Sequence, residues 1–260
     1  MDFDYSDDQK FLKDEARKFL AAHCDVAVVR GVLDNPERAF DEKLWKGVAE
    51  QGWLGACIPE EFGGLGLGRV ELCAIAEELG RAVAPIPFAS TVYVLAEGVM
   101  AFGSDAQKAA ILPRIAAGEL IGCLATSEGP GVVGPASLQC RVEGGKLTGT
   151  KIPVTDGDVA GVALVLASEG GRPGLFLADL SGAGVTRETL KSLDPTRSVA
   201  KLTFAGAAAE RIGDAGAGFE IVQAILDRAA VLLAFEQCGG ADRCLEMAKE
   251  YALERYASAG

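Results

Sequence analysis

The sequence predicts an α+β protein with an N-terminal all-α domain, a middle antiparallel β-sandwich or barrel, and the start of a C-terminal helical bundle. Apolar residues recur at helical spacing in the first part of the chain, alternate with polar residues in the middle, and return to helical spacing near the end. The short strand candidates in the middle follow one another with no helix between them, which favours antiparallel pairing. The predicted domains are 1–118, 119–212 and 213–260.

Local signals predict several helices before residue 119. Ser6, Asp7, Asp8 and Gln9 form a capping box, and apolar residues follow it at helical spacing. Asp41 is a predicted cap for the next helix. Two later apolar runs also have helical spacing: Leu72, Ile75, Ala76 and Leu79, then Val92, Leu95, Ala96 and Val99. Gly80 suits the C-terminal stop of the first of these runs. Pro113 suits the first turn of a further helix or a break.

The middle segment contains short alternating runs that predict strands. One run is Leu138, Cys140 and Val142, followed by a hairpin turn over residues 143–146. Further strands are expected over residues 162–167, 175–180 and 201–204. The stretch T-K-I-P-V-T-D-G-D at 150–158 also favours a strand, but Pro153 has no N–H to donate to a sheet. From its residues alone it is an edge strand that ends in an Asp-Gly turn.

A single long helix is expected from about Gly218 to Tyr256. One face of this helix contains Val222, Leu226, Ala229, Leu233, Gln237, Gly240 and Cys244. An amphipathic helix of this length needs a partner for its apolar face. Either another chain covers that face, which predicts an oligomer, or part of the fold is missing.

Bulk composition excludes several classes of function. Of the 260 residues, 49% are hydrophobic, so a sizeable core is expected, and the net charge of −12 argues against nucleic acid and anionic membranes as partners. Seven scattered cysteines without a C-x-x-C pair indicate reduced core cysteines. The acidic start has no signal-peptide pattern and no apolar run is long enough to span a membrane, so a cytoplasmic location is expected.

Two further patterns speak against other chemistries. His23 is the only histidine, so a metal site or a Ser-His-Asp triad is not expected. We expect His23 to lie at a helix end or on the surface. The glycine-rich stretch at 65–68 has no preceding strand and no Gly-Lys-Ser/Thr, so it is expected to be a loop between helices.

Six motifs follow one another along the chain: G-W-L-G-A-C-I-P-E-E-F-G-G-L-G-L-G (52–68), A-E-E-L-G-R (76–81), L-A-T-S-E (124–128), G-T-K-I-P-V-T-D-G (149–157), L-D-P-T-R (193–197) and G-G-A-D-R-C-L-E-M-A-K-E-Y-A-L-E-R (239–255). In this order they resemble the acyl-CoA dehydrogenase family. The resemblance implies FAD held between the β domain and a C-terminal four-helix bundle. It also implies α,β-dehydrogenation of an acyl-CoA thioester, with an electron-transfer flavoprotein as the acceptor of the electrons.

The resemblance implies five cofactor contacts. Thr126 and Ser127 occupy the family's flavin-contacting T-E-P region, although the serine that reaches the FAD pyrophosphate is absent or shifted to Ser137. Thr155 matches the threonine of the family's W-I-T-N-G run, and Pro153 stands where its tryptophan covers the flavin. Arg255 matches an arginine that reaches the FAD of a neighbouring subunit. The alternatives are an ordinary strand end, an Asp-Gly turn and a solvated helix-end arginine.

No residue is predicted as the catalytic base. The resemblance places the glutamate that removes the α-proton at Ala229, which cannot accept a proton. Glu236 lies two helical turns further on. It is expected to be a charged residue on the helix surface or to contact another subunit. Asp227 and Arg228 match a stretch near the acyl-CoA cleft and are predicted to bind the substrate, with an intrahelical charged pair as the alternative.

Three functional hypotheses remain open. The first is an acyl-CoA dehydrogenase chain that binds FAD and acyl-CoA. The second is a non-catalytic partner subunit of a hetero-oligomer, or a truncated inactive chain, and the third is a cofactor-free acyl-CoA-binding or scaffold protein. The resemblance stops near Arg255, for which we consider a natural short subunit, a fragment, or a frameshift near Ala257.

Overall fold

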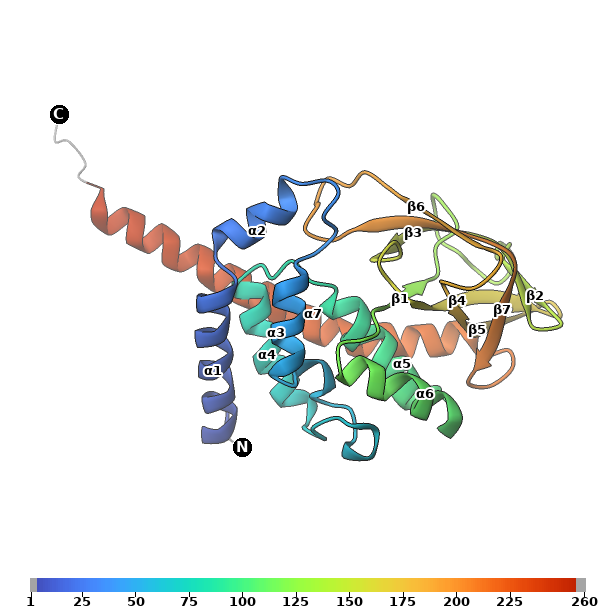
Figure 1. Ribbon diagram of the computed structural model, residues 1–260, viewed down its shortest axis with the longest axis horizontal. Coiled ribbons are helices and arrows are strands. Elements are labelled where there is room, and N and C mark those ends of the chain that lie inside the picture. Colours follow the sequence, from blue (N-terminus) through green and yellow to red (C-terminus); the bar gives the residue numbers. More distant parts are fainter. Residues whose placement is uncertain (1–3, 256–260) are drawn as a thin grey trace.

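Helices form the first half of the described chain, which comprises residues 4–255 of the computed structural model (Figure 1). The expected frameshift near Ala257 falls outside these residues. The helical elements before the sheet are α1 (Asp7–His23), α2 (Val26–Leu33), α3 (Glu42–Glu50), η1 (Trp53–Gly55), η2 (Glu60–Phe62), α4 (Arg69–Arg81), η3 (Ala89–Ala96), α5 (Glu97–Phe102) and α6 (Asp105–Ala116). The predicted fold class is confirmed, with a helical N-terminal part, a β-barrel and a C-terminal helix.

The predicted helix starts are confirmed by their capping contacts. The Ser6 hydroxyl accepts the Gln9 N–H, and the Gln9 side chain accepts the Ser6 N–H, so both halves of the capping box are present. The Asp41 carboxylate accepts the Leu44 N–H at 2.7 Å. His23 is the last residue of α1, where its exposed ring contacts the Phe19 carbonyl, as expected of a helix-end histidine.

Two predicted helix boundaries are wrong. Gly80 lies inside α4, which continues to Arg81, and its lack of a side chain is used for close packing against another helix. Pro113 lies late in α6 and not in its first turn. Because Ile111, Leu112 and Ile115 are buried around it, packing holds this last turn in place despite the missing N–H.

The strands form a closed barrel. They are β1 (Gly122–Ala125), β2 (Arg141–Glu143), β3 (Lys146–Thr155), β4 (Val162–Glu169), β5 (Arg172–Asp179), β6 (Val185–Thr189) and β7 (Val199–Ile212). The order is β1-β4-β2-β3-β7-β5, β5 also pairs with β4, and β6 pairs with β7. The Glu143–Lys146 turn was predicted and is confirmed, whereas β6 was not predicted.

The sheet differs from the purely antiparallel prediction in two pairings. Strand β4 runs parallel to both β1 and β2. The predicted strand start at Leu138 is also wrong, because β2 begins only at Arg141. The Glu128 carboxylate accepts the N–H groups of Gln139 and Cys140, so these donors are not available to extend the ladder on that side.

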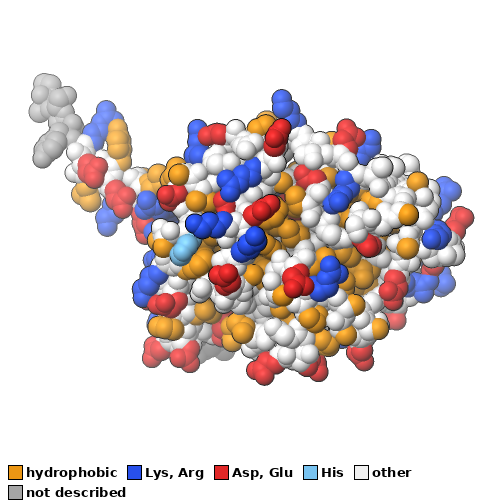
Figure 2. Space-filling view, in the orientation of Figure 1, with side chains coloured by type: hydrophobic (Ala, Val, Ile, Leu, Met, Phe, Trp, Pro, Cys, Tyr) orange, Lys and Arg blue, Asp and Glu red, His pale blue; other side chains and the backbone are white. Residues whose placement is uncertain are grey.

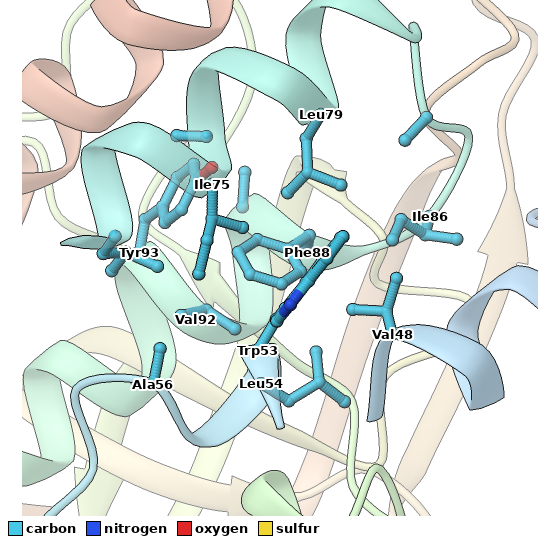
Figure 3. Packing of buried hydrophobic residues seen from close by; sticks show 14 of the residues in the cluster. Val48, Trp53, Leu54, Ala56, Ile75, Leu79, Ile86, Phe88, Val92 and Tyr93 are labelled. Atoms are coloured by element: carbon cyan, nitrogen blue, oxygen red, sulfur yellow. The ribbon is translucent and has the colours of Figure 1, made fainter. Parts of the chain in front are cut away.

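Three apolar clusters hold these layers together. One fills the helical part, where Phe88 lies among Ile75, Leu79, Trp53 and Tyr93 (Figure 3). The second fills the barrel, and the third joins the outer face of β4 and β5 to α5, α6 and α7. The helical part and the barrel therefore share a continuous apolar contact, along which the last helix lies.

The predicted long helix is confirmed as α7 (Gly218–Glu254), about 55 Å at 1.5 Å per residue. Its predicted apolar face is right at Val222 and Ala229, which are buried, and wrong at Leu226, Leu233 and Cys244. The buried positions are Gly218, Ile221, Val222, Ile225, Ala229, Leu232 and Gly239, whereas Leu226, Leu233 and Cys244 are exposed. The C-terminal part of α7 projects beyond the other elements with apolar side chains on its surface (Figure 2).

The cysteine prediction is right for part of the set. Four cysteines are buried (Cys24, Cys73, Cys123 and Cys140), whereas Cys238 and Cys244 are exposed on α7, and none of the seven is paired. Between residues 4 and 255 no helix has both the length and the apolar character needed to cross a bilayer. The same residues contain no cluster of His, Cys, Asp or Glu that could hold a metal ion.

Candidate flavin edge and adjoining pocket

Two segments far apart in sequence meet at one edge of the barrel. The first, Thr126 and Ser127, directly follows β1, and the second is the end of β3. The Ile152 N–H donates to the Ser127 carbonyl at 2.9 Å, and Glu128 forms an isolated β-bridge with Ile152. The structure therefore places the predicted residues Thr126 and Ser127 beside the strand that contains Pro153 and Thr155.

A buried ion pair fixes this junction. The Lys151 ammonium is fully buried and donates to the Thr126 carbonyl at 3.0 Å and to the Glu128 carboxylate at 2.8 Å. Burial alone would raise the pKa of Glu128, but the hydrogen bonds from Lys151 and from the Cys140 and Gln139 N–H groups bring that pKa below its ordinary value. The pair was not predicted, although the Lys and Glu both lie within the quoted motifs.

Pro153 and Thr155 face the same way. Val154 is buried between the exposed residues Pro153 and Thr155, as alternation along a strand requires. Lys151 is buried as well, because the pairing of β3 with β7 shifts register between Lys151 and Val154. The Ile152–Pro153 peptide bond is cis. Within residues 4–255 the Thr155 hydroxyl has no hydrogen-bond partner. Four of the five predicted cofactor contacts thus lie on one edge: Thr126, Ser127, Pro153 and Thr155.

The predicted Asp-Gly turn follows Thr155 and contains an unusual carboxylate. Asp156 is buried with a φ of 56°, a region in which Asp is tolerated better than most residues. Its carboxylate accepts the Ser90 hydroxyl at 2.6 Å and the Ser198 hydroxyl at 3.4 Å. Burial raises the pKa of Asp156, and these hydrogen bonds oppose that rise. Asp156 therefore ties the strand end to the helical part.

A pocket of about 210 Å³ opens between the helical part and the loop before β7. Its apolar wall includes Leu79, Ile86 and Phe88. Its polar residues include Glu236 of α7, which accepts the Tyr93 hydroxyl at 2.9 Å and the Arg197 guanidinium at 3.1 Å. This cluster was missed, because its partners are as much as 143 positions apart.

Glu236 has the environment of a perturbed carboxyl group. Burial raises the pKa of Glu236, while Arg197 and the Tyr93 hydroxyl oppose the rise. The expected helix charge or subunit contact is therefore an incomplete description of this residue. Its two oxygens are each engaged, Oε1 by Tyr93 and Oε2 by Arg197.

The remaining predicted site residues lie elsewhere. Arg255 caps the projecting end of α7, where its guanidinium donates to the Tyr251 hydroxyl, while the helix begins against β5. Asp227 accepts a bond from Gln223, and Arg228 binds Glu97 of α5. The alternative of a pair between Asp227 and Arg228 is therefore wrong. Ala229, the position expected for a base, is buried in the helical core.

The geometry is suited to a flat polar group on the barrel edge. Gly129 and Gly131 have positive φ values and have no atom within 4 Å of the place where a Cβ would lie, so the loop after Ser127 leaves open space. Thr155 is exposed and Thr126 and Ser127 are half-buried, and their hydroxyl groups lie on the same barrel edge as this loop. These residues therefore fit the edge of an isoalloxazine ring.

Comparisons with known proteins agree with this arrangement. The family "Acyl-CoA dehydrogenase, N-terminal domain" matches residues 6–119. The acyl-CoA dehydrogenase IpdE2 of Mycobacterium tuberculosis is 30% identical over 250 residues, which are 96% of this chain and 65% of that protein. The chain therefore spans slightly less than two thirds of the length of this relative.

Solved structures resemble nearly the whole chain. A Tcur3481-Tcur3483 steroid ACAD variant is 30% identical, with a TM-score of 0.84, and 97% of this chain covers 68% of it. An acyl-CoA dehydrogenase of Bacillus anthracis complexed with FAD is 26% identical, with a TM-score of 0.86 and coverages of 98% and 46%. The ChsE4-ChsE5 complex of Mycobacterium tuberculosis is 26% identical, with a TM-score of 0.82 and coverages of 100% and 70%.

Proposed function

Because the chain belongs to the acyl-CoA dehydrogenase family, we propose that it acts as an FAD-dependent flavoprotein in the α,β-dehydrogenation of an acyl-CoA thioester. The observation that carries this proposal is the meeting of Thr126, Ser127, Pro153 and Thr155 at one barrel edge. An electron-transfer flavoprotein is the proposed oxidant of the reduced enzyme, and a second subunit is the proposed partner of the exposed part of α7.

The residues of the edge have separate tasks in this proposal. The hydroxyl of Thr155 and the backbone N–H groups of Thr126 and Ser127 would hold the rim of the flavin, because the carbonyls of Thr126 and Ser127 already accept hydrogen bonds from Lys151 and Ile152. Pro153 would offer a flat apolar surface smaller than an aromatic ring. Arg255 would reach the diphosphate of the FAD bound by a neighbouring subunit, because a guanidinium presents a rigid fork of donors that suits a diphosphate. When bound, FAD supplies the acceptor for the hydride that leaves Cβ.

Proton removal from Cα is the step for which this chain offers least. The α-proton of a thioester is weakly acidic, so its removal requires a carboxylate that can reach it. Ala229 presents a buried methyl group, and Glu236 is bound by both Tyr93 and Arg197. This observation favours a second candidate function, a non-catalytic subunit that shapes the site of a partner chain.

Thr155 gives a direct test of the flavin edge. Replacing Thr155 by valine removes one hydrogen bond and is expected to weaken FAD binding about three- to tenfold, since such a bond contributes about 1 kcal/mol. FAD affinity is measured by quenching of flavin fluorescence during titration of the purified protein. Thr148→Val, an exposed change on the same strand away from this edge, is the control. Equal FAD affinity in wild type and Thr155→Val would contradict the assignment.

The two candidate functions differ in what the purified chain does alone. If the chain is catalytic, acyl-CoA bleaches its bound flavin without any other protein. If it is a partner subunit, bleaching requires a co-purified second acyl-CoA dehydrogenase chain, and the mixture forms a hetero-oligomer in sedimentation analysis. A flavin-free protein that binds acyl-CoA with or without such a partner would contradict both.

A further inference from the structure

Three charged side chains from different helices converge on the face of the helical part where α4 begins. Arg69 is the first residue of α4, Glu97 is the first of α5, and Arg228 lies on α7. Both guanidiniums donate to the same carboxylate oxygen, Oε1 of Glu97, Arg69 at a distance of 2.7 Å. Glu97 is buried, whereas both arginine side chains retain substantial exposure.

This cluster of two arginines and one glutamate has a net positive charge. One arginine would neutralise Glu97, and the second adds a charge of the same sign within reach of the same oxygen atom. Glu97 offsets one of the two positive charges, and the remaining one attracts a further anion. A guanidinium has five N–H donors, and within the described residues each of these two arginines has Glu97 as its hydrogen-bond partner. Several donors therefore remain for a second oxyanion.

Arg69 and Arg228 line an open pocket of about 340 Å³. The three charged residues form part of its lining, and the apolar part includes Leu67, Met100 and Ala101. This volume is within the range of small-molecule sites. The charged residues that line it are Arg69, Glu97 and Arg228, so its local charge is positive in a chain whose net charge is −12.

We propose that this pocket binds an oxyanion, a carboxylate or a phosphate, that is attached to an apolar body. The anion pairs with the outward N–H groups of Arg69 and Arg228, for which a planar fork of donors gives bidentate geometry. The apolar body lies against Leu67 and Met100. Glu97 holds the two guanidiniums in place from the buried side. The site does not depend on flavin binding.

The test uses hexanoate, acetate and inorganic phosphate as separate probes of the full-length protein. The arginine Nε–H signals are followed by NMR at constant ionic strength. Saturable shifts of the Arg69 and Arg228 signals are expected with hexanoate or with phosphate, and the stronger probe identifies the source of the anion. Hexanoate should bind more tightly than acetate because its chain meets the apolar wall.

The variants separate an anion site from a structural brace. Arg228→Gln should weaken binding of the stronger probe about tenfold, since a charge-assisted hydrogen bond is lost. Arg243→Gln, a change on α7 at a residue paired with Glu246 and Glu250, should leave it unchanged. If Arg228→Gln does not fold, Arg69→Gln at the more exposed partner carries the same expectation. Shifts that do not saturate, or equal weakening in Arg243→Gln, would overturn the proposal.

Discussion

Replacing Lys151 by methionine should destabilise the protein by about 3–5 kcal/mol, because it leaves a buried carboxylate without its cation. Lys151 is fully buried, and its ammonium binds both Glu128 and the Thr126 carbonyl. The free energy of unfolding is measured by urea denaturation. Lys146→Met, on the same strand but exposed, is the control and should change stability by less than about 0.5 kcal/mol.

The double replacement distinguishes loss of the ion pair from loss of packing. Adding Glu128→Gln to Lys151→Met should recover part of the stability, because the unpaired charge is removed. The effect of Lys151→Met should also shrink with acid. The pKa of Glu128 is below its ordinary value of 4.5 in the folded protein, so the pair's contribution is present above that pH and is lost as pH falls through the folded value. A penalty that is constant down to pH 2–3 would contradict this account.

Lys151→Met should also weaken FAD binding at the candidate flavin edge. Lys151 is a positioning residue, since it holds the Thr126 carbonyl and, through Glu128, the loop after Ser127. Under conditions where Lys151→Met stays folded, we expect weaker FAD binding than in a variant of equal stability that is altered elsewhere. Unchanged FAD affinity would limit Lys151 to a structural role.

Gly239→Ala should lower the free energy of unfolding by about 3 kcal/mol or more, because the added methyl group has no room. A Cβ on Gly239 would lie 1.8 Å from the Glu77 carbonyl oxygen of α4, and one on Gly80 would lie 1.9 Å from the Glu236 carbonyl oxygen of α7. The two helices cross here with their backbones in contact, so the clash involves atoms that cannot rotate away. Thermal and urea unfolding of Gly239→Ala would measure the loss.

The adjacent glycine is a matched control. A Cβ on Gly240 would meet its nearest atom, the Gly80 carbonyl oxygen, at 3.5 Å, which is an ordinary contact. Gly240→Ala should therefore be neutral or stabilise α7 by up to about 1 kcal/mol through helix propensity. Similar losses in Gly239→Ala and Gly240→Ala would show that the helices do not cross at the position described. Because Glu236 lies in this crossing, Gly239→Ala should also displace its carboxylate from Tyr93 and Arg197.

The sequence alone determined the features that depend on near neighbours. The Ser6–Gln9 capping box, the Glu143–Lys146 hairpin and the long helix α7 follow from residues within a few positions of one another. The six motifs also predict Thr126, Ser127, Pro153 and Thr155 as cofactor contacts, and these four residues lie on one barrel edge. Such patterns predict helices and strands from the spacing of apolar residues. This spacing does not determine which other element packs against the apolar face.

Only the tertiary structure decided which residues of separate helices and strands contact one another. Gly80 has the local signature of a helix end, yet it allows two helix backbones to touch. The buried stripe of α7 differs from the apolar stripe read from the sequence, because burial depends on where α4, η3 and the barrel lie. Lys151 with Glu128, Tyr93 with Glu236, and Arg69 with Arg228 on Glu97 join separate elements. Their energies arise from burial and distance in space, and no local pattern of residues encodes either.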